Sequence, residues 1–145
     1  MKPRRSERMQ LVLNLALRAE TQAAQNLGEA QKLHEAEQKR LADINQYYAN
    51  YEKHFSERTQ NLRASELASS RYFLSNLDSA CQQQQLQVQS AEHCVDEART
   101  KWRESHLKSD ALDDFRDRCI KVEQQSMDKK EQAQMDELAL RRPVQ

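Results

Sequence analysis

The sequence predicts an all-α fold, a two-helix antiparallel coiled-coil hairpin with flexible termini. Three observations predict it: helix-breaking residues are nearly absent, two long runs of residues repeat at spacings of three and four, and this pattern lapses once between the runs. The single glycine is Gly28, and the two prolines, Pro3 and Pro143, lie near the chain ends. Because glycine and proline make most tight turns, this composition favours a few long helices over a globule of many short elements.

Residues 1–8 are expected to form a flexible basic tail, and residues 9–62 the first long helix. We interpret the tail as solvated, with contact to a membrane surface or an acidic partner as the alternative; its basic residues are Lys2, Arg4, Arg5 and Arg8. A three-four stripe places its members on one helix face and drives supercoiling against a partner helix. In the first helix the stripe comprises Leu13, Ala16, Glu20, Ala23, Leu27, Ala30, His34, Glu37, Leu41, Ile44, Tyr48, Tyr51, Phe55, Arg58 and Leu62.

The hairpin turn is expected at residues 63–66, followed by a second long helix over residues 67–140 and a flexible tail over residues 141–145. Residues 57–70 are rich in Ser and Asn, which favour caps and turns, and Ser65 before Glu66 is a candidate N-cap. The second stripe comprises Leu74, Leu77, Cys81, Gln84, Val88, Ala91, Val95, Ala98, Trp102, Ser105, Lys108, Leu112, Phe115, Cys119 and Val122. Successive steps of three at Ser105 and Lys108 predict a stammer that brings Lys108 opposite Glu20.

Folding the chain near residue 64 brings seam residues of matching size opposite one another. Small Ala30 then faces Ala98, and Trp102 lies over Leu27 beside small Ala23. The alternative is one continuous helix that dimerises. The lapse in the pattern and the matched layers favour the hairpin.

Charge and composition also bear on function. Net charge is zero, with 23 basic and 23 acidic residues, which argues against a nucleic-acid partner. A phosphate-binding loop needs several glycines, and a two-helix rod has no interior in which catalytic groups converge. We therefore expect no enzymatic activity, no cofactor and no metal. A metal pair of His34 with His93 or Cys94 is conceivable, but we interpret His34 as a polar seam residue, and His54 and His106 as exposed.

Three cysteines in no recognised pattern suggest a reducing compartment, so we expect a cytoplasmic protein. Residues 9–17 faintly mimic a signal peptide, but Asn14 interrupts the stretch and it runs directly into a helical pattern. No window of the sequence approaches the roughly 18 apolar residues that a membrane span requires.

An excess of apolar residues lies on one flank near the expected turn. Tyr47, Phe73 and Ala80 occupy positions beside the seam, where a two-stranded coil does not need apolar side chains. The flank is either a widened seam or a docking patch, since exposed aromatic residues are typical of protein interfaces.

Several segments together resemble one protein family. They are the step of Ile44, Tyr47 and Tyr51, the segment at 71–80 (RYFLSNLDSA), the segment at 101–104 (KWRE) with Ala111 and Leu112, and the tail at 131–142 (EQAQMDELALRR). In this order and spacing they make the chain resemble the FliJ family of the bacterial flagellar type III export apparatus over nearly its whole length. Residues 57–70 look short or altered against the usual family tip. Injectisome stalk proteins share the architecture and are the nearest alternative.

The resemblance implies a stalk that inserts into the flagellar export ATPase ring, promotes ring assembly, links the ring to the membrane export gate protein and takes part in handling export chaperones. It implies a location on the inner face of the cell membrane at the flagellar base, with peripheral membrane association only. The family's gate contact maps onto Ile44, Tyr47, Tyr51, Phe73, Leu77, Ala80 and Gln84.

If the chain is a stalk, its open end enters the ring, and charges on the second helix make weak, exchangeable contacts there. The basic residues expected to do so are Arg116, Arg118, Lys121, Lys129, Lys130, Arg141 and Arg142. The alternatives are a generic coiled-coil scaffold or tether without an ATPase partner, and a chaperone for unfolded export substrates.

Overall fold

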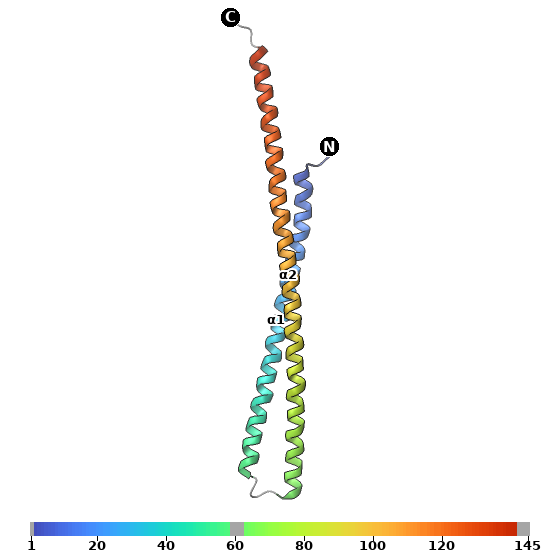
Figure 1. Cartoon of the computed structure of the whole chain (residues 1–145), viewed down its shortest axis with the longest axis vertical. Coiled ribbons are helices and arrows are strands. Elements are labelled where there is room, and N and C mark those ends of the chain that lie inside the picture. The colour runs from blue at the N-terminus through green and yellow to red at the C-terminus, as the bar shows by residue number, and fades with distance from the viewer. Residues whose placement is uncertain (1, 59–62, 142–145) are drawn as a thin grey trace. The chain divides into compact units, whose positions relative to one another are not determined.

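The computed structural model describes residues 2–58 and 63–141, which form two helices (Figure 1). Helix α1 spans Arg5–Arg58 and helix α2 spans Ala64–Arg141, and no strand occurs within these described ranges. The helices pack against each other with antiparallel directions, so the predicted all-α helical hairpin is confirmed.

The two helices associate in two compact units, each of which takes a segment from both helices. The terminal unit consists of Met1–Gln22 and Arg103–Gln145, and the central unit consists of Ala23–Trp102. In the terminal unit Ser6 bonds to Glu123, and in the central unit Glu37 bonds to Gln84. Each unit is therefore held by contacts between residues that are far apart in the sequence.

In the central unit, the predicted stripe is the face that α1 and α2 bury against each other. The α1 members from Ala23 to Phe55 are half-buried, while Arg58 is exposed and Leu62 lies outside the described residues. On α2, Cys81, Ala91 and Val95 are buried, and the other members from Leu74 to Trp102 are half-buried. The three-four spacing thus gave the seam of this unit correctly.

In the terminal unit the predicted stammer is wrong. Lys108 is exposed, and Ser109 beside it is only 2% exposed. Farther along, Glu123 is half-buried where the prediction placed Val122, which is 64% exposed. The spacing of three and four therefore continues without a slip. A serine can occupy the seam here because its hydroxyl bonds to the Glu20 carboxylate.

Helix α1 begins at Arg5, four residues before the predicted start at residue 9. The Ser6 hydroxyl and backbone N–H donate to the two carboxylate oxygens of Glu123, at 2.6 and 3.1 Å. The Arg5 guanidinium lies 5.1 Å from the centre of the Phe115 ring, a cation–π contact. These contacts with α2 give part of the predicted tail a helical conformation that its own sequence does not indicate.

Helix α2 begins at Ala64, inside the segment predicted as the turn, and ends at Arg141. The backbone N–H of Leu67 donates to the carbonyl of Arg63 at 3.0 Å, so Ser65 lies within the first turn and is not the N-cap. Glu66 does lie in that first turn, where a carboxylate interacts favourably with the helix dipole. The rest of the predicted turn region and the chain end, residues 59–62 and 142–145, lies outside the described residues.

Candidate partner-binding surfaces

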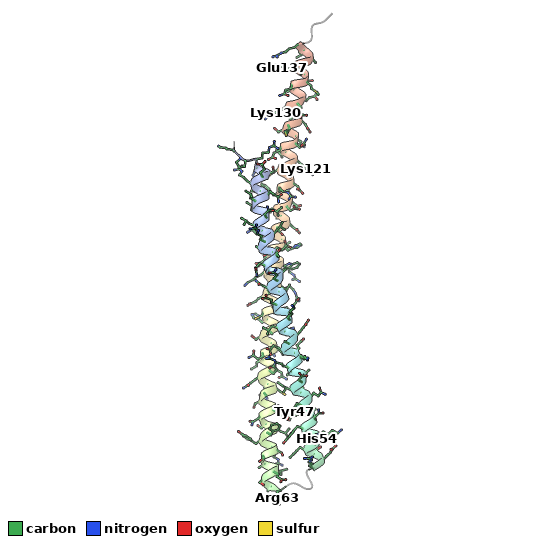
Figure 2. All side chains as sticks on the ribbon, turned by 180° about the vertical axis from the view of Figure 1, so that it is seen from behind. Tyr47, His54, Arg63, Lys121, Lys130 and Glu137 are labelled. Atoms are coloured by element: carbon green, nitrogen blue, oxygen red, sulfur yellow. The ribbon has the colours of Figure 1, made fainter. Side chains whose placement is uncertain are left out.

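The flank predicted to bind a partner gathers in the central unit around three aromatic rings. Tyr47 and Phe73 form an edge-to-face pair with ring centres 6.3 Å apart, and Tyr51 lies 4.6 Å from the same Phe73 ring. Tyr47 is 54% exposed and Phe73 is 36% exposed, whereas Tyr51 is half-buried. The rings therefore offer an aromatic surface from both helices, and Tyr47, which Figure 2 labels, is the most exposed of the three.

The other predicted members of this flank are less accessible. Ile44, Leu77 and Ala80 are half-buried. The Gln84 side-chain amide donates to the Glu37 carbonyl at 3.0 Å and to the Glu37 carboxylate at 2.5 Å. Gln84 therefore ties the two helices together, and a partner would have to compete with these bonds to engage it.

Tyr72 is an aromatic residue that the sequence reasoning left out. It is 72% exposed, which makes it more accessible than either Tyr47 or Phe73. It directly precedes Phe73. Because its position lies outside the three-four stripe, the sequence could have indicated that this aromatic ring is exposed. Nearby, Tyr51, His54, Phe55, Arg58 and Ser70 line a hollow of about 100 Å³.

Arg116, the first residue predicted for the ATPase ring, is occupied within the chain. Its guanidinium donates to Asp117 at 2.9 and 3.2 Å, to Asp113 at 2.6 Å and to Gln10 of α1 at 2.9 Å. The hydrogen bond with Asp117, together with the charges of both aspartates, raises the pKa of Arg116. This side chain therefore positions α1 on α2 and is less available to a partner.

The remaining predicted basic residues lie on exposed parts of α2. Arg118, Lys121, Lys129 and Lys130 are exposed, and Arg141 pairs with Glu137 at 2.7 Å. Arg142 lies outside the described residues. Figure 2 shows Lys130 and Glu137 on the stretch of α2 that continues past the start of α1.

This stretch, residues 124–141, is called the overhang below. Every residue of it is exposed, because Glu123 is the last residue of α2 with a bond to α1 in the described chain. The sequence reasoning considered only its charges and missed its exposed apolar side chains. These are Met127, Met135, Leu138 and Leu140, with exposed fractions of 43%, 68%, 65% and 87%.

A second hollow lies at the beginning of α1 in the terminal unit. It has a volume of about 220 Å³ and is lined by Arg5, Phe115, Arg118, Cys119, Val122 and Glu123. Its lining is mainly apolar, so the exposed Arg118 borders an apolar depression.

Within the described part of the chain, no group of three or more His, Cys, Asp or Glu side chains is placed to hold a metal ion. His93 pairs with Glu97 of its own helix at 3.0 Å. Neither described helix has a stretch long and apolar enough to cross a membrane.

Comparison with protein families gives a match over almost the entire sequence. The family described as Flagellar FliJ protein matches residues 5–145. The chain belongs to the FliJ family. This confirms the resemblance and places the chain in flagellar protein export. The FliJ family is not known for enzymatic activity. No curated protein and no solved structure gave a match.

Proposed function

We propose that this FliJ-family chain is a non-enzymatic stalk of the flagellar type III protein export apparatus. It inserts into the export ATPase ring, promotes ring assembly, couples the ring to the membrane export gate and takes part in handling export chaperones. It acts in the cytoplasm and associates peripherally with the membrane at the flagellar base, without a nucleic-acid partner. The observation that carries the proposal is the overhang, a helical segment of α2 that has every side chain exposed.

The overhang suits insertion into a ring because of the kind of contact it can make. Its charges are of both signs, with Lys129 and Lys130 next to Glu131. Exposed ion pairs of this sort contribute under about 1 kcal/mol each, so contacts with successive ring subunits exchange readily. Exposed Met135 and Leu138 add apolar surface of the flexible kind that accommodates different partners.

The gate contact is proposed at the aromatic flank of the central unit. Tyr47 and Phe73 present accessible ring surface from different helices, and aromatic residues often dominate binding energy at interfaces. Tyr51 packs against Phe73, and the other proposed members of the contact, Ile44, Leu77 and Ala80, are half-buried. Gln84 contributes least, since Glu37 already binds its amide.

Two variants separate the proposed contacts and serve as controls for each other. Deleting residues 124–145 should abolish stimulation of the export ATPase and leave gate binding intact. Replacing both Tyr47 and Phe73 with alanine should weaken gate binding by about 1 kcal/mol or more per anchor residue and leave ATPase stimulation intact. Stimulation is measured as ATP hydrolysis with sub-stoichiometric chain, and gate binding by titration with the cytoplasmic part of the gate protein.

Helicity and thermal unfolding must be recorded for both variants. Full stimulation by the truncated chain would refute the ring contact at the overhang. If the Tyr47→Ala/Phe73→Ala chain loses its helical structure, the rings belong to the core and the docking proposal is wrong. If the chain binds no flagellar ATPase, the scaffold alternative is favoured. If it stimulates only an injectisome ATPase, the injectisome-stalk alternative is favoured.

A further inference from the structure

A cluster of polar side chains joins α1 and α2 inside the terminal unit. Glu20 comes from α1, and His106, Ser109 and Asp110 come from α2. The His106 Nδ1 lies 2.7 Å from one carboxylate oxygen of Glu20, and the Ser109 hydroxyl donates to the other. Ser109 is 2% exposed and the Glu20 side chain is 20% exposed, whereas the side chains of His106 and Asp110 are 45% and 65% exposed, so the cluster extends from the buried seam to the surface. His106, predicted to be exposed, is half-buried.

Both ring nitrogens of His106 face carboxylates. Nδ1 faces Glu20, and Nε2 lies 3.4 Å from a carboxylate oxygen of Asp110. A neutral imidazole carries one N–H and can donate to only one of the two. Its other nitrogen then presents a lone pair to a negatively charged oxygen. Only the doubly protonated ring satisfies both carboxylates, so the arrangement is complete only when His106 carries a positive charge.

The charges that face the His106 ring favour its doubly protonated, positively charged state. Facing His106, α1 contributes Glu20 and α2 contributes Asp110. The hydrogen bond with Glu20, followed by the charge of Asp110, raises the pKa of His106, and partial burial opposes this less strongly. Hydrogen bonds from Ser109 and His106 lower the pKa of Glu20, so this carboxylate stays ionised where the ring is protonated.

We propose that Glu20, His106 and Asp110 form a pH-dependent latch that holds the first turns of α1 on α2 and weakens when His106 loses its second proton. A histidine with a raised folded-state pKa contributes stability that is fully present below its unfolded value, about 6.5, and is lost as pH rises through the folded value. Glu20, with a lowered pKa, adds stability above its unfolded value that is lost only in stronger acid. The latch is therefore strongest in mild acid and weakens through neutral and alkaline pH.

The pairing of this unit is sensitive to one such cluster because polar bonds supply a large part of its described contacts between the helices. On α1, Leu13 and Ala16 are buried in this unit, and its other described bonds to α2 come from Ser6, Gln10 and Glu20. Helix ends already open more readily than helix centres. Weakening the latch therefore increases opening of residues 5–22, while the central unit, held by its own seam, is unaffected.

Amide hydrogen exchange of the full chain between pH 6 and pH 8.5 tests the latch. After correction for the intrinsic exchange rate, protection of residues 5–22 should fall by about two- to five-fold over this range, as expected for a partly exposed ion pair. His106→Gln keeps one donor but cannot titrate, so its protection should stay flat. His93→Gln is the matched control, because His93 pairs with Glu97 within one helix of the central unit, and it should behave like the wild type.

Ring resonances in the wild-type chain supply a test that needs no substitution. His106 should titrate above the ordinary histidine value of about 6.5, and a value at or below it overturns the latch. A full wild-type pH dependence in His106→Gln also overturns it. Should His106→Gln unfold the unit, Asp110→Asn replaces it. Removing the second carboxylate should reduce the pH dependence, and an unchanged dependence contradicts the geometry.

Discussion

In the central unit the two helices meet through apolar and aromatic side chains and the bond of Gln84 to Glu37, whereas in the terminal unit a series of polar bonds accompanies a buried apolar seam. Tyr47, Tyr51 and Phe73 form the ring contacts of the first. In the second, the bonds between helices join Ser6 to Glu123, Gln10 to Arg116, and Glu20 to His106 and Ser109. One pair of continuous helices thus combines apolar and polar contacts in different proportions along its length.

The difference has physical consequences for each unit. Apolar burial has no preferred direction and depends little on pH or salt. Hydrogen bonds and ion pairs require a defined geometry, and exposed charges are screened at physiological ionic strength. We therefore expect the central unit to provide constant stability, and the terminal unit, which contains the overhang proposed to enter the ring, to respond to its surroundings.

The largest expected effect comes from placing a charge in the central seam. Val95 is 7% exposed, so Val95→Asp leaves a carboxylate buried without a partner and should lower the free energy of unfolding by about 3 kcal/mol. Val122→Asp makes the same chemical change at a residue that is 64% exposed, and should change the free energy of unfolding by under about 0.5 kcal/mol. Urea unfolding followed by circular dichroism measures both. Equal losses would contradict the apolar character assigned to the central seam.

Sequence periodicity predicted the central unit well because its seam is apolar. Residues that repeat at three and four share a helix face whatever else surrounds them, so Ile44, Leu77 and Val95 could be placed without a structure. The terminal unit was harder because polar residues interrupt its seam. Ser109 carries no hydrophobic signal, and its burial is possible because Glu20 of the other helix accepts a hydrogen bond from its hydroxyl.

The candidate binding surfaces also combine features that the sequence predicted with features that it did not. The proximity of Tyr47 and Phe73 followed from the hairpin pairing and was predicted correctly. Two features did not follow from charge or spacing: Gln84 is bound by Glu37, and Arg116 is bound by Gln10 and two aspartates. Such bonds depend on the positions of side chains on facing helices, which a periodic pattern does not encode. Both binding surfaces therefore stay predictions.

A moderate gain in stability is expected at the histidine of the central seam. His34 is half-buried, and its Nε2 is enclosed without a hydrogen-bond partner among the described residues. A buried polar atom without a partner costs about 1–3 kcal/mol. His34→Leu should therefore raise the free energy of unfolding by about 1–2 kcal/mol, and would make the central seam more uniformly apolar.

His54→Leu is the control for this substitution, because His54 is exposed and its replacement should change stability by under about 0.5 kcal/mol. Thermal and urea unfolding of both variants give the comparison. If His34→Leu is no more stable than the wild type, the polar interruption does not weaken the central seam.

The smallest expected effect concerns the backbone of α1 and is independent of the side-chain chemistry of either seam. Gly28 lies inside the helix, and a methyl group added there meets no atom within 4 Å. Gly28→Ala should therefore stabilise the chain by about 0.5–1 kcal/mol, because glycine loses more backbone freedom on folding than alanine. Ala24→Gly, at an exposed position one turn earlier, should cost a similar amount. Since both changes act on the backbone, their effects should be equal at pH 6 and pH 8.5, unlike that of His106→Gln. A destabilised Gly28→Ala chain would mean that α2 approaches α1 more closely at this point than the structure shows.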